Sequence, residues 1–410
     1  MARNEQIVVG LDLGTTKTSV LVGLRSEEDL EIVGLGTAPS SGLRKGVVVN
    51  LDSTVESIRQ AVEEAENICG QKIRLVQTGI AGSHIQGMNS HGIIGVRDRE
   101  VSERDVAQVL DAARAVAIPM DREVIATIPR QFFLDDQEGV MDPVGMSGVR
   151  LEVDVHIITV AAASLQNIYR CCNKAGLDVR EVVLHQLASS RAVLTPEERE
   201  LGVVLVDIGG GTTDIAVYTE GNIVYTSCLP LGGDQVTNDI AIGLRTPREA
   251  AEKIKRQYGC TTSQPADLDE VIEVPSVGGR PPRRLSRQIL GEIIEPRLEE
   301  IFELANRELH KSGVYDQVAS GVVVTGGTAL LQGTEELAEK VFELQSRIGF
   351  PRSQGSGFEA VAEPAYATAV GLVQYAADES RNPARRRTGR PRLGSGELFS
   401  RFGEWLKDFF

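Results

Sequence analysis

Two short turns rich in glycine and threonine, far apart in the chain, have the composition of a backbone that binds phosphate. They consist of Gly14, Thr15, Thr16 and Lys17 in the first turn, and of Gly209, Gly210, Gly211, Thr212 and Thr213 in the second. Glycine lets a ligand approach the main chain closely, and successive N–H groups form a concavity that attracts anions. Neither turn has the spacing of a Walker loop or of a dinucleotide fingerprint. One such turn alone would be weak evidence, but two predict a phosphate chain held across a cleft.

An aspartate stands at the end of the apolar strand that leads into each turn. Asp12 precedes the first turn, Asp207 precedes the second, and Asp214 follows the second. Mg²⁺ prefers oxygen ligands and keeps much of its water shell, so carboxylates beside a phosphate can orient its bound waters. The sequence therefore predicts that these three aspartates hold Mg²⁺ through water.

The two turns belong to two copies of one pattern. Residues 7–23 (IVVGLDLGTTKTSVLVG) and residues 202–218 (GVVLVDIGGGTTDIAVY) both run from an apolar strand through Asp-x-Gly and a turn into an alternating strand. Asp12 aligns with Asp207, and Val20 aligns with Ile215. Tandem solenoids repeat at a much shorter period. The pattern instead predicts two related halves, each carrying a β-hairpin of the same kind.

A third glycine-rich turn has the sequence expected beside a nucleoside. In VVVTGGTALLQG, residues 322–333, a strand ends in Gly326, Gly327 and Thr328 and leads into a helix. A flat base could lie against such a backbone. Alone, the segment would be an ordinary strand–turn–helix joint, so its interpretation depends on the two phosphate turns.

Hydrophobic periodicity predicts the elements that must position these turns. Helices are expected at residues 53–69, 103–117, 164–174, 187–194, 334–343 and 366–377, and strands at residues 76–82, 149–159, 179–184 and 320–327. Thr246 and Pro247 indicate the N-cap and first-turn proline of a helix at 246–258. Residues 261–284 are predicted to be irregular, and residues 287–311 form a long helix expected to break or kink near Pro296.

These motifs resemble the actin/heat-shock chaperone/sugar kinase superfamily, and within it the FtsA family of bacterial cell-division proteins. The resemblance covers most of residues 7–377 and is specific in residues 40–66, 89–96, 142–159, 166–177 and 237–255. It implies an α/β, actin-like two-lobed ATPase fold with an inserted αβ subdomain and a C-terminal amphipathic helix on a disordered linker.

The resemblance, together with composition, also divides the chain into domains. Residues 1–82 and 161–200 are assigned to the first actin-like half and residues 83–160 to the inserted subdomain. The second half comprises residues 201–243 and 313–379, with residues 244–312 as its small subdomain. Residues 380–395 are rich in arginine, proline and glycine and predict a disordered linker before the amphipathic helix at 396–410.

The resemblance implies a role in cell division and further site residues. The protein would bind ATP and Mg²⁺, polymerise with itself, tether FtsZ filaments to the inner face of the cytoplasmic membrane and recruit later division proteins. Glu252 and Lys255 match the adenosine-ribose contacts, and Arg297 is a candidate contact for the acidic C-terminal tail of FtsZ. Gln186 falls at the water-positioning place; since glutamine is no general base at neutral pH, at most slow ATP hydrolysis is expected.

The last fifteen residues predict a helix that lies on a membrane surface. At 100° per residue the large apolar side chains fall within an arc of about 140°. They are Leu398, Phe399, Phe402, Trp405, Leu406, Phe409 and Phe410. An interfacial helix buries such a face at the headgroup boundary, and the upstream arginines would attract anionic lipid. The alternative is a helix that docks on the protein's own body or on a second copy.

Composition limits the remaining classes. The formal net charge of −15 argues against nucleic-acid binding, which needs a basic surface. No apolar run is long enough to span a bilayer, and the N-terminus lacks a signal peptide, so a cytoplasmic protein that binds the membrane peripherally at the division site is expected. A sugar kinase of the same superfamily and a PilM-like pilus-assembly adaptor stay as alternatives. A chaperone is excluded because about thirty residues after the ATPase cannot form a peptide-binding domain.

Overall fold

Two five-stranded sheets with the same strand order form the centre of the computed structural model, which describes residues 6–26, 29–261, 270–278, 280–352 and 355–379. The first sheet has the order β11-β6-β1-β2-β3. The second, read in the matching direction, has the order β18-β17-β12-β13-β14. The strands of the first sheet are β1 (Gln6–Leu13), β2 (Lys17–Arg25), β3 (Leu30–Pro39), β6 (Leu75–Ile80) and β11 (Asp178–Leu184). Those of the second are β12 (Val203–Ile208), β13 (Thr213–Thr219), β14 (Asn222–Leu229), β17 (Val322–Thr325) and β18 (Ser346–Ile348).

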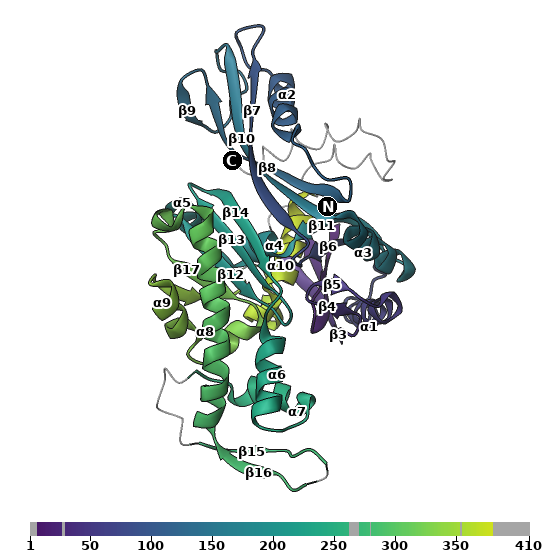
Figure 1. Ribbon diagram of the computed structural model, residues 1–410. Coiled ribbons are helices and arrows are strands. Elements are labelled where there is room, and N and C mark those ends of the chain that lie inside the picture. Colours follow the sequence, from purple (N-terminus) through teal and green to yellow (C-terminus); the bar gives the residue numbers. More distant parts are fainter. Residues whose placement is uncertain (1–5, 27–28, 262–269, 279, 353–354, 380–410) are drawn as a thin grey trace.

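The two sheets confirm the predicted pair of related halves. Each sheet contains an antiparallel hairpin, β1–β2 or β12–β13. The first strand of the hairpin also pairs with a parallel neighbour, β6 or β17. Asp12 pairs with Ser19 in the first hairpin, and Asp207 pairs with Asp214 at the same place in the second. The mixed α/β architecture is therefore a duplicated one (Figure 1).

Two helices, α4 (His185–Val193) and α10 (Ala367–Glu379), pack together between the sheets. α10 contacts β1 and β2, whereas α4 contacts β12 and β13. Their close approach requires Gly371, because a Cβ atom there would lie 1.8 Å from the Ala188 carbonyl oxygen. The first half is completed by α1 (Leu51–Cys69), α3 (Ala162–Lys174), α5 (Pro196–Leu201), β4 (Leu43–Arg44) and β5 (Val47–Val48).

The sequence of α1 shows why these helices form where they do. The Asn50 side chain accepts a hydrogen bond from the Ser53 N–H group and caps the first turn, and Gly70 ends the helix in the left-handed conformation at φ 69°. Ile58 and Ala61 lie on the buried face that packs against β3. The capping residues and the helical spacing of the apolar residues therefore indicate the same helix.

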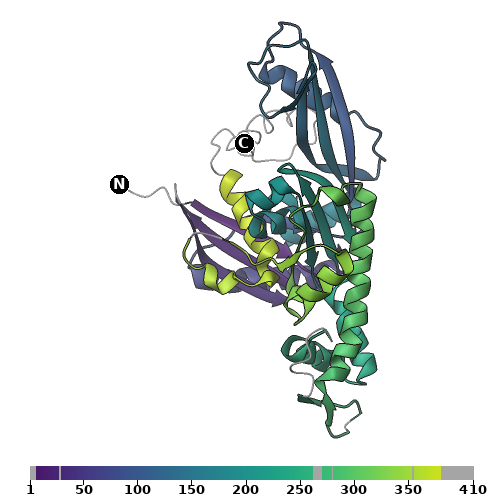
Figure 2. The same cartoon turned by 90° about the vertical axis from the view of Figure 1, so that its left-hand side faces the viewer.

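An inserted subdomain projects from one end of the molecule (Figures 1 and 2). Its sheet has the order β7-β10-β8-β9, with α2 (Glu103–Arg114) packed against β7 and β10. The strands are β7 (Gln86–Gly95), β8 (Arg122–Leu134), β9 (Gln137–Val140) and β10 (Arg150–Ala161). It has a hydrophobic cluster of its own, built around fully buried Leu151, Val153 and Val155.

In its described residues the second half carries four further α-helices, and a small hairpin projects from the end opposite the inserted subdomain (Figure 2). The helices are α6 (Gly233–Gly243), α7 (Arg248–Tyr258), α8 (Arg287–Ser312) and α9 (Thr334–Phe342). The short 3-10 helices are η2 (Tyr315–Gln317), η3 (Gly327–Leu330), η4 (Phe358–Val361) and η5 (Pro364–Tyr366). The hairpin consists of β15 (Val271–Val274) and β16 (Arg283–Ser286).

Three sequence expectations for the second half are wrong. Residues 261–284 were expected to be irregular, but they contain the strand β15, in which Ile272 and Val274 are buried. The alternation of buried and exposed residues is short and lies in a stretch rich in proline and glycine, so the sequence did not indicate this strand. Of the break or kink expected near Pro296, the break does not occur, since α8 continues through this proline with Ile294 and Leu298 buried on either side of it.

The third wrong expectation is the cap of α7. Pro247, with ψ 145°, occupies the N-cap position and has no side-chain cap, so the helix begins at Arg248 and Thr246 does not cap it. The predicted linker and the amphipathic helix at 396–410 lie outside the described residues.

Candidate nucleotide-binding site

The two predicted phosphate turns meet across the gap between the halves. A Cβ atom at Gly210 would lie 1.9 Å from Thr16 Oγ1, and one at Gly211 would lie 2.6 Å from Thr15 Oγ1. Each turn is closed in the same way, by an N–H bond from Gly14 to the Lys17 carbonyl (3.1 Å) and from Gly209 to the Thr212 carbonyl (2.9 Å). Only a backbone without side chains at these positions lets the hairpins approach this closely.

The three predicted aspartates are buried behind the turns. Asp12 Oδ1 and Asp214 Oδ1 have no hydrogen-bond partner. Asp214 Oδ2 accepts a bond from Thr212 Oγ1 at 3.0 Å, and Asp207 Oδ2 accepts one from Thr368 Oγ1 at 3.2 Å. Burial raises the pKa of each of the three carboxyls to about 6. The site therefore concentrates acidic groups whose charge is incompletely balanced by protein partners.

Two neighbouring side chains at the start of α4 complete this cluster. Gln186 Nε2 donates to the Ser227 carbonyl at 3.2 Å, and Gln186 Oε1 has no partner. His185 Nε2 lies 3.6 Å from Asp12 Oδ1, and burial lowers the pKa of this imidazole. The sequence predicted Gln186 but not His185, since no histidine has a partner at metal-binding spacing. The sequence signal that could have identified His185 is its position directly after the strand β11.

The side chains predicted to contact adenosine lie beside the second hairpin. Lys255 Nζ lies 2.7 Å from Glu252 Oε2 and donates to Thr237 Oγ1 at 2.8 Å and to the Gly233 carbonyl at 3.1 Å. The Gly233 N–H group in turn donates to the Gly209 carbonyl at 2.9 Å. The structure thus connects the pair to the phosphate turn.

The third glycine-rich turn is anchored to the same hairpin. Thr328 Oγ1 donates to the Gly209 carbonyl at 3.2 Å. Gly326 has a left-handed φ of 85°, and a Cβ atom there would lie 2.5 Å from Asp207 Oδ1. Gly327 begins the 3-10 helix η3. The structure therefore brings the three segments chosen from the sequence together.

Arg297, predicted to contact a partner protein, does not belong to this site. It lies on α8, where Nε is 2.6 Å and Nη2 3.4 Å from the two carboxylate oxygens of Asp239 on α6. Glu300 also binds the guanidinium. An acidic partner peptide must therefore share or displace these carboxylates.

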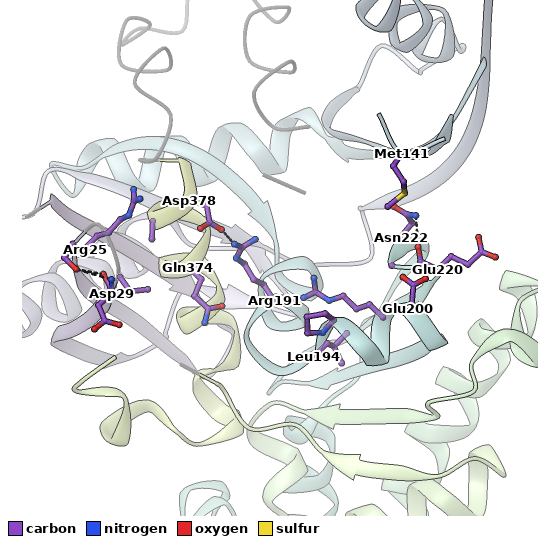
Figure 3. Close-up of a pocket in the computed structure, with 16 residues that line it drawn as sticks. Arg25, Asp29, Met141, Arg191, Leu194, Glu200, Glu220, Asn222, Gln374 and Asp378 are labelled. Carbon is purple, nitrogen blue, oxygen red and sulfur yellow. Dashed lines mark hydrogen bonds and ion pairs between the residues drawn. The ribbon is translucent and has the colours of Figure 1, made fainter. Parts of the chain in front are cut away.

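A separate cavity of about 620 Å³ lies at the far end of α10 (Figure 3). Two of its lining side chains, Arg191 and Asp378, form an ion pair, and the Arg191 guanidinium also lies 5.0 Å from the ring centroid of Tyr375, which does not line the cavity. No residue of the two phosphate turns lines it. The cavity is therefore not part of the candidate site.

Asp214→Asn is expected to stabilise the nucleotide-free protein above pH 6. Because folding raises this pKa from 3.8 to about 6, the folded state binds a proton more readily than the unfolded chain, so the folded state loses stability as pH rises through this window. Asparagine removes the penalty, which should add about 1–3 kcal/mol to the free energy of unfolding at pH 8 and nothing below pH 3.8.

Urea denaturation at pH 8 and at the acid end of the window measures this difference. Asp136→Asn is the matched control, since its side chain is fully exposed. An equal change at both pH values would contradict the account of a buried, unbalanced carboxylate.

The sheet order and the gap between matched hairpins define an actin-like fold, and comparison with solved structures supports this class. A chain of the PilM–PilN type IV pilus biogenesis complex superposes with a TM-score of 0.64 at 17% identity, covering 90% of this chain and 98% of that one. MreB5 of Spiroplasma citri bound to ADP superposes with a TM-score of 0.56 at 13% identity, covering 92% and 99%. At these identities the likeness concerns the fold alone.

Sequence relatives identify the family within this class. The family model of cell division protein FtsA matches residues 204–371, and the SHS2 domain inserted in FtsA matches residues 82–159. FtsA of Pseudomonas aeruginosa is 52% identical over 371 residues, covering 90% of this chain and 89% of that protein. FtsA of Neisseria meningitidis is 43% identical over the whole of both chains. The chain belongs to the FtsA family of cell division proteins, which confirms the resemblance found in the sequence.

Proposed function

We propose that the protein is an ATP-binding, actin-like scaffold that polymerises and tethers FtsZ filaments to the inner face of the cell membrane, where it recruits other division proteins. The observation that carries the nucleotide part is the contact of two matched hairpins, turn to turn, with three buried aspartates behind them. Solved structures of MreB5 are described as bound to ADP and to AMPPNP, and their fold is shared. A nucleotide bound between the hairpins would favour the closed arrangement of the two halves.

The residues present fit a magnesium ion held through water. Asp12 Oδ1, Asp214 Oδ1 and Gln186 Oε1 are buried acceptors without a hydrogen-bond partner, which bound waters of a cation can satisfy. Within the described residues, no group of three His, Cys, Asp or Glu side chains is placed to hold a metal directly. When bound, the ion would neutralise phosphate charge. Asp12, Asp207 and Asp214 would orient its waters.

The protein residues suit binding better than rapid hydrolysis. Gln186 is fixed through its amide nitrogen to the Ser227 carbonyl, which leaves Oε1 free to accept a bond from a water. An amide orients that water but does not remove its proton. We therefore infer at most slow ATP turnover, with the nucleotide acting mainly as a bridge between the halves.

The inserted subdomain is proposed to form part of the contact between successive copies. Several apolar side chains on it are exposed: Met88, Ile93, Met120, Val124, Met141, Val144 and Val149. A head-to-tail interface that does not close into a ring produces a filament.

The membrane contact is assigned to the apolar face predicted for residues 396–410. No helix in the described part of the chain is long and apolar enough to cross a bilayer.

Arg297→Ala is expected to weaken binding of a peptide with the sequence of the acidic FtsZ tail by about tenfold, the loss typical of a hydrogen bond to a charged group. Fluorescence anisotropy of the labelled peptide measures the affinity. Arg307→Ala is the matched control: this arginine lies on the same helix, is 65% exposed and pairs only loosely with Glu303 at 3.7 Å. Equal binding by the Arg297 variant and the parent would remove Arg297 from the FtsZ contact.

A further inference from the structure

The segment that leads into α10 contacts both phosphate hairpins. Lys17 Nζ, from the first hairpin, donates to the Ala365 carbonyl at 3.2 Å and lies 3.4 Å from the centroid of the Tyr366 ring. Thr368 Oγ1, one helical position beyond Ala367, donates to Asp207 Oδ2 of the second hairpin at 3.2 Å. Residues 365–368 therefore contact one charged side chain from each half, Lys17 of the first and Asp207 of the second.

The contacts of Lys17 suit an ammonium group that must stay available to phosphate. Burial lowers the pKa of Lys17, so the charged form needs compensation from its surroundings. A carbonyl oxygen and the negative face of an aromatic ring supply attraction without a formal negative charge. These direct partners are neutral and fix the ammonium beside the first turn, while the Asp12 and Glu363 carboxylates attract it electrostatically and favour its charged form.

The contacts of Asp207 fix the direction of its carboxylate. Oδ1 lies so close to Gly326 that a Cβ atom there would be 2.5 Å away, and Oδ2 accepts the Thr368 hydroxyl. Asp207 and Thr368 are both buried. The Thr368 hydroxyl on α10, together with the Ser189 hydroxyl on α4, therefore sets the orientation of a carboxylate on the second hairpin.

We propose that Tyr366 and Thr368 are positioning residues for nucleotide binding: Tyr366 places Lys17 for contact with a phosphate oxygen, and Thr368 places Asp207 for contact with metal-bound water. The inference rests on the proposed ATP site. The two roles predict a different dependence of ATP affinity on Mg²⁺. The contact between Lys17 and phosphate needs no metal, whereas the Asp207 carboxylate acts only through the metal's waters.

The test measures ATP affinity of the full chain by calorimetry, once with Mg²⁺ and once with EDTA. Thr368→Val should weaken ATP binding about tenfold with Mg²⁺, the loss typical of a hydrogen bond to a charged group, and leave the EDTA value unchanged. Thr368→Ser keeps the hydroxyl and should restore the parent affinity. Tyr366→Leu should weaken binding about threefold under both conditions, and Tyr366→Phe, which keeps the ring face, should match the parent.

Thr54→Val is the matched control, because its buried hydroxyl donates only to the Asn50 carbonyl in α1 at 2.7 Å. Equal losses with Mg²⁺ and with EDTA for Thr368→Val, or no rescue by serine, would overturn the role of Thr368. A loss in Tyr366→Phe as large as in Tyr366→Leu would overturn the role of the ring. If the parent itself fails to bind ATP, the proposed function fails; if the parent binds and the variants match it, only this inference fails.

Discussion

Gly210→Asp is expected to abolish ATP binding while the protein stays folded. A Cβ atom at this position would lie 1.9 Å from Thr16 Oγ1 and 3.1 Å from Thr16 Cβ, so the two turns must separate. The new carboxylate also stands where phosphate oxygens are expected, and like charges so placed cost several kcal/mol. The affinity should therefore fall by more than about a hundredfold.

Calorimetric titration with ATP and Mg²⁺ measures this loss, and the thermal midpoint without nucleotide reports on folding. Gly95→Asp provides the matched control, since a Cβ atom at Gly95 meets only the Val149 carbonyl oxygen at 3.9 Å. Parent-like affinity in Gly210→Asp would show that phosphate does not lie between the two hairpins.

Truncation after Gly394 is expected to release the protein from anionic liposomes and leave ATP affinity unchanged. The removed segment contains seven large apolar side chains, predicted on one helical face, and lies outside the described residues. Fully burying such a side chain is worth roughly 1.5–3 kcal/mol, so even partial insertion of the face should dominate membrane binding. Liposome co-sedimentation measures the effect, and raised salt should reduce parent binding only in part.

Single substitutions separate the membrane face from the rest of the tail. Phe402→Glu puts a charge in the centre of the apolar arc and should act like the truncation. Ser400→Glu adds the same charge on the opposite side of the predicted helix and should retain most binding. Parent-level sedimentation of the truncated chain would require another membrane anchor, and equal losses in both variants would argue against a one-sided helix.

Local patterns explain why much of the site could be predicted from the sequence. A strand–turn–strand unit is encoded by neighbouring residues, so both hairpins and the alignment of Asp12 with Asp207 were visible without any tertiary information. The third turn, around Gly326, was recognised in the same way. The family resemblance added Glu252 and Lys255, which the structure places beside the second hairpin.

Contacts between distant segments could not be predicted. Thr368 reaches Asp207, and Tyr366 reaches Lys17, only because α10 packs between the two sheets. Neither side chain belongs to a glycine-rich or acidic motif. His185 was missed for the same reason, since its significance comes from its 3.6 Å approach to Asp12.

Two local rules also failed where tertiary packing outweighed them. Proline disfavours a helix interior, yet α8 continues through Pro296 because it packs along the hydrophobic clusters of the second half on both sides of that residue. The β15–β16 hairpin forms in a glycine- and proline-rich stretch because Ile272 and Val274 join one of these clusters.

The central claim, that this chain tethers FtsZ to a membrane in an ATP-dependent manner, is tested most directly by vesicle flotation with three components. Anionic liposomes, the full chain and a labelled FtsZ-tail peptide are mixed with ATP and Mg²⁺ and separated on a density gradient. The account predicts that the peptide floats only when the full chain is present, and that flotation falls with EDTA, with Gly210→Asp and with truncation after Gly394. If the full chain floats with the vesicles while the peptide stays in the bottom fraction, the proposed tether is contradicted.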